Sequence, residues 1–303
     1  MPSTLPRAAV VILLAASVIL AAPAAAGAQG EADVFVATLD TRAGAVHVGV
    51  PRNVTNRVGY DNQPSFTRDG GAIFYTSTRQ DAQADIYRYV LATGRETRVT
   101  RTAPESEYSA TEVPGGGAIS VIRVERDSAQ RLWRIPLHGG EESVILPALK
   151  PVGYHAWADA THIAMFVLGD PPVLVLGDLT TGRSDTVMAN IGRALHRIPG
   201  GRHISFVSKA YENAFWVMEL DVDSREMRPL ARLPQGVEDY AWLPDGRLIA
   251  GNGSKLLVCN LSTRATWEEV ADLKDAGVSG ITRLAVSPRG DRLAIVGVPA
   301  AAR

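Results

Sequence analysis

A four-strand pattern repeats along this chain every 41 to 46 residues, and this repeat constrains the fold more than any other feature. Each period begins with a short strand, a turn rich in Pro, Asp or Gly, and a second strand. The first apolar residue after that turn marks the repeat, and it falls at Ile73, Ile119, Ile163, Ile204, Leu248 and Leu293. Self-similarity at this period is typical of propeller blades, which hold four strands each.

A second pattern alternates with the first and indicates a hairpin. Apolar and polar residues alternate on both sides of a turn such as Thr-Gly, Gly-Gly or Asp-Ser. Examples are DIYRYVLATGRETRVT from Asp85, VLVLGDLTTGRSDTVM from Val173 and FWVMELDVDSREMRPL from Phe215. Each period therefore contains four strands and no segment with a helical pattern.

The two ends of the chain supply complementary halves of one more blade. The last unit of the first kind, Ile281 to Gly297, is not followed by a hairpin, whereas Asp33 to Val50 is a hairpin without a preceding unit. Pairing them closes a ring and leaves no free radial edge. We therefore predict an all-β, six-bladed propeller of four-stranded antiparallel blades, closed by N-terminal strands on the C-terminal hairpin. A β-sandwich or a β-helix would not explain this split.

The segments SFTRDGGAIFYTS, AWLPDGRLIAG and AVSPRGDRLAIVG resemble the WD-like repeats of TolB-like β-propellers. The resemblance extends over essentially all of the chain after its first 28 residues. Members of that family serve as periplasmic scaffolds, as ligand-binding modules and as gating domains of peptidases. The resemblance thus implies the fold and leaves the function open among these classes.

The first 28 residues have the pattern of a secretory signal peptide. Arg7 supplies a positive charge, Ala8 to Ala22 is an uncharged apolar run, and Ala26-Gly27-Ala28 fits the rule for signal-peptide cleavage. The alternative is an uncleaved membrane anchor, but the run is shorter than the ~20 residues that span a bilayer. We expect residues 1–28 to be removed and residues 29–303 to form a single propeller domain. The mature protein would be exported to the periplasm or the medium, without a transmembrane segment.

Composition and motifs argue against several function classes. The chain holds 31 Lys and Arg against 32 Asp and Glu, whereas a nucleic-acid-binding surface carries excess positive charge. The sequence lacks the G-x-S-x-G, H-E-x-x-H and G-x-x-x-x-G-K-[ST] motifs of common hydrolases and nucleotide-binding proteins. The one cysteine, Cys259, lies in an apolar strand pattern and is expected to be a small buried residue.

Polar and aromatic residues gather near the starts of the inner strands, which line the channel of a propeller. In five blades an apolar residue lies just before the turn that follows the inner strand. These anchor residues, on which we align the blades, are Phe66, Trp157, Ile198, Trp242 and Val286. The position two residues before the anchor then holds Pro64, His155, His196, Tyr240 and Leu284. Propeller closure should bring these starts together at one mouth of the channel. The predicted site consists of Tyr108, Tyr154, His155, His196, Asp239, Tyr240 and Arg283. Alternatively, these polar groups only satisfy strand ends and channel water.

A ring of this kind suits a small ligand. Arg283 would orient an anionic group, and the two histidines would make binding depend on pH near ~6.5. We predict a monomeric, non-catalytic binding or scaffold module without a cofactor, whose partner is an envelope protein or a small ligand. The alternative is a metal-dependent hydrolase or lyase, as in lactonase-like propellers, with a divalent metal held by His155, His196 and a carboxylate.

Overall fold

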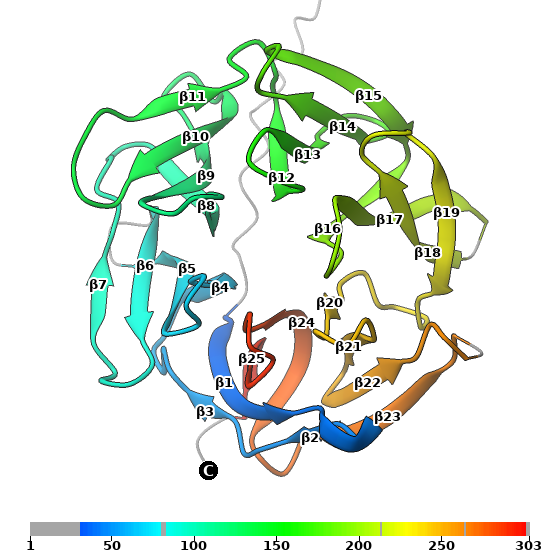
Figure 1. Ribbon diagram of the computed structural model, residues 1–303. Coiled ribbons are helices and arrows are strands. Elements are labelled where there is room, and N and C mark those ends of the chain that lie inside the picture. Colours follow the sequence, from blue (N-terminus) through cyan, green and yellow to red (C-terminus); the bar gives the residue numbers. More distant parts are fainter. Residues whose placement is uncertain (1–30, 80–82, 213, 264, 301–303) are drawn as a thin grey trace, which may run out of the picture.

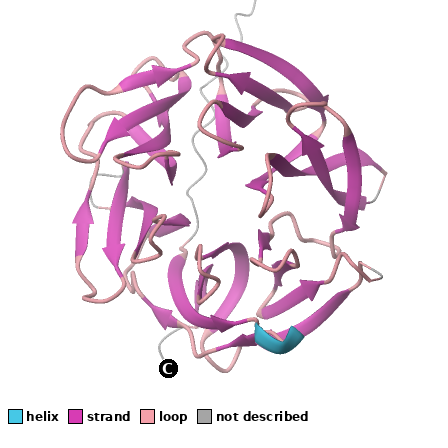
Figure 2. Ribbon diagram, viewed as in Figure 1, coloured by secondary structure: helices cyan, strands magenta, loops and turns pink. Residues whose placement is uncertain are grey.

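The computed structural model describes residues 31–79, 83–212, 214–263 and 265–300. Its regular elements are strands, apart from one 3-10 helix at Arg42–Gly44. The strands form six sheets that stand round a common centre (Figures 1 and 2). The expected signal peptide, residues 1–28, lies outside the described residues. Within the described ranges, no helix is long and apolar enough to cross a membrane.

Five blades are each made of four consecutive strands, ordered from the centre of the ring to its rim (Figure 1). Blade 1 contains β4 (Tyr60–Phe66), β5 (Ala72–Thr78), β6 (Ala84–Val90) and β7 (Glu96–Arg98). Blade 2 contains β8 (Ser106–Glu112), β9 (Ala118–Val124), β10 (Gln130–Pro136) and β11 (Ser143–Ile145). Blade 3 contains β12 (Val152–Trp157), β13 (His162–Val167), β14 (Val173–Asp178) and β15 (Arg183–Ala189).

The next two blades follow the same order. Blade 4 contains β16 (Ile191–Arg197), β17 (His203–Tyr211), β18 (Ala214–Asp221) and β19 (Met227–Arg232). Blade 5 contains β20 (Ala241–Trp242), β21 (Leu248–Asn252), β22 (Lys255–Cys259) and β23 (Trp267–Asp272). The predicted sequence of two hairpins in each period is therefore confirmed.

Blade 6 joins the two ends of the described chain. β24 (Val278–Val286) and β25 (Arg292–Pro299) form its inner half. β1 (Asp33–Asp40) pairs with β25 in antiparallel register, from Asp33 opposite Gly297 to Thr38 opposite Arg292. β2 (His47–Val48) and the short β3 (Arg52–Asn53) both pair with β1. The predicted closure of the ring is confirmed.

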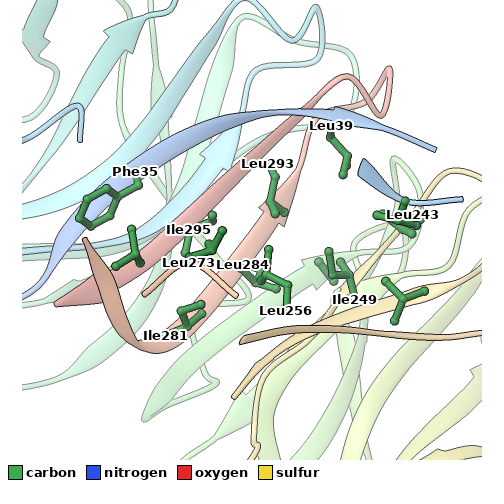
Figure 3. Packing of buried hydrophobic residues seen from close by; sticks show 14 residues of the cluster. Phe35, Leu39, Leu243, Ile249, Leu256, Leu273, Ile281, Leu284, Leu293 and Ile295 are labelled. Atoms are coloured by element: carbon green, nitrogen blue, oxygen red, sulfur yellow. The ribbon is translucent and has the colours of Figure 1, made fainter. Parts of the chain in front are cut away.

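The hydrophobic core consists of six clusters, and each lies between two neighbouring blades. Figure 3 shows the cluster between blades 5 and 6, to which Leu256, Leu284 and Ile295 belong. Phe35 of β1 also belongs to this cluster. Since side chains alternate between the two faces of a strand, every blade buries both faces against its neighbours. The stability of each blade therefore depends on the blades beside it.

Cys259 lies in the cluster between blades 4 and 5 and is fully buried. Burial raises the pKa of its thiol to about 11. The thiol therefore stays protonated at neutral pH, which makes it a poor nucleophile. Its expected place as a small buried residue is confirmed.

Phe35 provides a test of how the N-terminal strand contributes to the core. Its side chain is 4% exposed. We expect Phe35→Ala to lower the free energy of unfolding by about 3–5 kcal/mol, because truncation of a buried aromatic ring leaves a cavity. Val50→Ala is the control, since Val50 is 85% exposed and its truncation should change stability by less than ~0.5 kcal/mol. Urea unfolding measures both variants, and equal effects would contradict this packing.

Candidate functional site

The six inner strands surround a cavity of about 660 Å³ on the axis of the ring. Its wall changes character along that axis. Toward the starts of the strands it holds the polar side chains of Gln63, Ser109, Tyr154, Arg193, Asp239 and Arg283. Toward their ends it holds Phe66, Trp157, Trp242 and Val286, with Glu112 and Arg197 in the two remaining blades. One end of the cavity is therefore polar, and the section above it is largely apolar.

The cavity opens at the ends of the inner strands. The lining residues there are exposed and lie in or beside the turns that lead to the second strands, among them Arg68, Gly115, Pro199, Pro244 and Pro288. The sequence predicted a mouth at the strand starts, whereas the exposed lining residues lie at the strand ends. Long Tyr and Arg side chains occupy the channel at the starts, whereas short Pro and Gly residues leave the other end open.

Arg283 and Tyr154 meet at the inner end of the cavity. They belong to blades 6 and 3, which face each other across the ring, so their contact crosses the axis (Figure 1). Arg283 Nη2 donates a hydrogen bond to the Tyr154 hydroxyl (2.9 Å), and the guanidinium carbon lies 4.9 Å from the centre of that ring. Asp239 of blade 5 is a looser partner, with Oδ2 3.7 Å from Arg283 Nη1.

Tyr60 of blade 1 is influenced by residues of four other blades at this end of the channel. The electrostatic effects on its hydroxyl come from Arg283, Arg193, Tyr154 and Tyr108. Burial raises the pKa of Tyr60 to about 12, so the hydroxyl is a neutral hydrogen-bond donor at physiological pH. With Asp239 of blade 5, side chains of all six blades thus gather toward the inner end.

Bulges in the inner strands position the polar residues of blades 1 and 2. The pairing register slips between Asn62 and Ser65 and at the equivalent place in blade 2. Gln63 and Ser109 lie in these bulges with φ values of 57° and 54°, in the left-handed region. Gln63 Oε1 accepts hydrogen bonds from Ser109 N (2.8 Å) and Thr76 Oγ1 (3.0 Å). These bonds fix the bulge of blade 1 against that of blade 2.

Three residues of the cavity wall contain buried polar atoms without hydrogen-bond partners. Arg193 Nε, His155 Nδ1 and His196 Nε2 are buried and have no hydrogen-bond partner among the described residues. Buried side-chain polar atoms in native proteins are mostly hydrogen-bonded. Three residues of the cavity wall therefore hold polar atoms whose hydrogen-bonding capacity the described residues leave unused.

His155 and Tyr240 each bond to a serine of the preceding blade. His155 Nε2 lies 2.7 Å from Ser120 Oγ, which also accepts a bond from Trp157 Nε1 (2.9 Å). The same arrangement recurs two blades later. There the Tyr240 hydroxyl donates to Ser205 Oγ (2.7 Å), which also accepts a bond from Trp242 Nε1. Tyr240 is fully buried between blades 4 and 5 and is not part of the cavity wall. Its interaction with blade 4 is structural.

His196 lies one residue further along its strand than the alignment placed it. Arg197 pairs with Ile204, so Arg197 is the equivalent of Trp157, which pairs with Ile163. The turn of blade 4 is one residue longer than that of blade 3, and the apolar Ile198 after the strand misled the alignment. His196 thus takes the position that alanine holds in blades 3, 5 and 6, and its ring lies 4.8 Å from that of Tyr240.

Five of the seven predicted residues line the cavity: Tyr154, His155, His196, Asp239 and Arg283. Tyr108 lies close to Tyr60 and Tyr154 but outside the cavity wall. Arg193 was missed because the slipped register of blade 4 hid its place in the strand. Burial lowers the pKa of both predicted histidines, that of His155 to about 3. The expected pH dependence of binding near ~6.5 therefore does not follow.

The charged residues of the wall favour an anion. Arg68, Arg193, Arg197 and Arg283 line the cavity, against the two carboxylates of Glu112 and Asp239. The Arg68 backbone N–H donates to Glu112 Oε2 (2.8 Å), so one oxygen of this carboxylate at the mouth already has a hydrogen-bond partner. The wall of the described cavity thus carries an excess of two positive charges.

Comparison with solved structures identifies the fold. A candidate TolB from Agrobacterium tumefaciens matches with a TM-score of 0.66 over 88% of this chain and 99% of its own, at 15% identity. TolB from Acinetobacter baumannii matches with a TM-score of 0.57 over 91% of this chain and 66% of its own, at 13% identity. The fold is TolB-like.

The TolB-like fold is shared by proteins with other activities. An oligogalacturonate lyase from Vibrio parahaemolyticus matches with a TM-score of 0.52 over 90% of this chain and 99% of its own, at 13% identity. No protein-family model matches the sequence, and no curated protein is significantly similar to it. Similarity at these identities shows the fold alone. The function of this TolB-like propeller must therefore be argued from its cavity.

The buried His155 leads to a prediction about stability and pH. The folded protein keeps this imidazole neutral down to a pKa of about 3, whereas the unfolded chain binds a proton near 6.5. Between these values the unfolded state holds more protons, so stability falls as pH falls, by about 1.4 kcal/mol per pH unit. His155→Leu introduces the residue found at this position in blades 4 and 6. We expect it to reduce the stability lost between pH 7.5 and pH 5.0 by about 2 kcal/mol.

Tyr240→Phe is the matched control for this experiment. It removes the equivalent bond to Ser205 without removing a group that titrates between pH 5 and 7.5. Its loss of stability over the same pH range should equal that of the wild type. Denaturant unfolding at the two pH values measures all three proteins. An unchanged pH dependence in His155→Leu would show that His155 is not held neutral.

Proposed function

We propose that this protein is an exported, non-catalytic binding module that takes a small ligand into the channel of its propeller. The ligand is either free or forms the end of an envelope partner. The observation that carries the proposal is the cavity of about 660 Å³ on the axis of the ring, whose wall combines Arg193 and Arg283 with the aromatic residues Trp157 and Trp242. Small-ligand sites are concave, largely apolar and supplied with a few convergent polar groups.

The two ends of the cavity differ in a way that suits binding. The inner end is rigid, since Arg283 and Tyr154 hold each other and Gln63 is bonded to its own blade and to the next. The outer end is formed by exposed turns through which a ligand can enter. A side-chain contact across the axis at one end and exposed turns at the other support capture of a molecule in the channel.

Export is supported by the first 28 residues, which have the composition of a signal peptide. Cys259 forms no disulfide, so the fold does not depend on whether its compartment is oxidising or reducing. We therefore place the module in the periplasm or the medium, as a monomer that meets envelope components there.

A metal-dependent lyase or hydrolase is the second candidate, because His155 and His196 both line the cavity and one solved structure with this fold is an oligogalacturonate lyase. The described residues contain no group of three or more His, Cys, Asp or Glu side chains placed to hold a metal ion. His155 Nε2 is also engaged by Ser120. Elemental analysis distinguishes the candidates: a stoichiometric divalent ion that is lost in His196→Ala would favour the enzyme.

Thr111→Trp tests whether ligands occupy the channel. Thr111 lines the cavity and is half-buried, so a tryptophan there would narrow the space. We expect wild-type protein purified from its native host to carry a non-covalent small molecule, visible as added mass in native mass spectrometry. Thr111→Trp should retain less than about a tenth of it, since overpacking of a site blocks its occupant.

Thr97→Trp is the control, because Thr97 is exposed on the rim strand β7. It should carry the same molecule in the same amount as the wild type. Equal retention by Thr111→Trp would place the molecule outside the channel. Wild-type protein without any added mass would contradict capture of a free small ligand.

A further inference from the structure

Arg193 is the least satisfied charged group of the cavity. Its side chain is half-buried in the cavity wall, and its Nε has no hydrogen-bond partner among the described residues. A partly desolvated cation gains more from an acceptor than a fully solvated one. The other arginine of the inner end, Arg283, has both Tyr154 and Asp239. An acceptor at the inner end would therefore satisfy Arg193 first.

Both arginines line the inner end of the same cavity. Arg193 comes from blade 4 and Arg283 from blade 6. Arg283 uses one of its five N–H donors on Tyr154, which leaves others for a ligand. Two guanidinium groups on the wall of one cavity form a donor set that suits a carboxylate.

The net charge of the inner end matches an anion with a single charge. Arg193 and Arg283 contribute two positive charges, and Asp239 removes one. His196 adds none near neutral pH, because burial lowers its pKa. One positive charge remains, and it is balanced by one carboxylate, whereas a phosphate monoester carries close to two negative charges.

The wall above this point is apolar. Phe66, Trp157 and Trp242 line the cavity there. The two indole N–H groups donate to Ser120 and Ser205, so the tryptophans present only ring surface to a ligand. Aromatic rings of this kind bury the apolar body of a bound molecule. A ligand that fits must therefore carry its charge at one end.

We propose that the inner end of the channel binds the carboxylate of a small amphiphilic acid, whose apolar body lies along Phe66, Trp157 and Trp242. The inference rests on the proposed function, since it assigns the ligand class of the same cavity. Arg193 and Arg283 hold the acid group, and the molecule enters through the turn face with that group first.

The test uses three probes that share a phenyl ring: 3-phenylpropionate, its amide and phenyl phosphate. Calorimetric titration should show the acid binding at least about tenfold more tightly than the amide, since the amide forms no ion pair with the arginines. Arg193→Gln should weaken acid binding by roughly 10- to 100-fold and leave amide binding unchanged. The same variant should unfold at about the same temperature as the wild type, because the half-buried Arg193 side chain has no hydrogen-bond partner at Nε for the change to remove.

Arg197→Gln is the matched control. Arg197 lines the exposed end of the cavity, so its loss should weaken acid binding by less than about threefold. Tighter binding of phenyl phosphate than of the acid would overturn the carboxylate assignment in favour of a phosphate. Equal binding of acid and amide, abolished for both in Thr111→Trp, would overturn the anion site and leave the channel-binding function standing. Failure of the acid to bind at ~10 mM would also overturn the inference. The native mass spectrometry of the wild type and Thr111→Trp tests the proposed function separately.

Discussion

The antiparallel pairing of β1 with β25 is the constraint on which the rest of the molecule depends. Each blade buries both of its faces against neighbours, so an open ring would expose apolar surface on two blades at once. The N-terminal strand closes blade 6 and adds Phe35 to the core. β25 in turn holds β24, which carries Arg283. The position of a charged group on the channel axis is therefore set by hydrogen bonds between the two ends of the chain.

The fold was predictable because its signals are local and repeated. The apolar residue after each inner turn, such as Ile73 or Leu293, recurs at a nearly constant interval, and the hairpin turns are marked by Gly, Asp and Pro. One register error arose in blade 4, where the turn is one residue longer than in blade 3. A difference of one residue does not disturb the period, but it changes which way a side chain points.

The site was predictable only in part, since convergence on the axis depends on bulges and on side-chain length. His155 and Tyr240 were grouped by position, yet both bond to serines of the preceding blade, and Tyr240 does not reach the cavity at all. Arg193 lies inside a long bulge of β16, which no short pattern in the sequence marks. The entrance was misplaced because the filling of a channel depends on contacts between opposite blades, such as Arg283 with Tyr154.

The central claim is that an acid enters the channel with its carboxylate directed to the arginines. Anomalous diffraction from crystals soaked in 3-(4-bromophenyl)propionate tests this directly, because bromine marks the apolar end of the probe. The account predicts bromine among Phe66, Trp157 and Trp242, with the carboxylate within hydrogen-bond distance of Arg193. Bromine at the inner end beside Tyr60, or on the outside of the ring with the channel empty of probe, would contradict it.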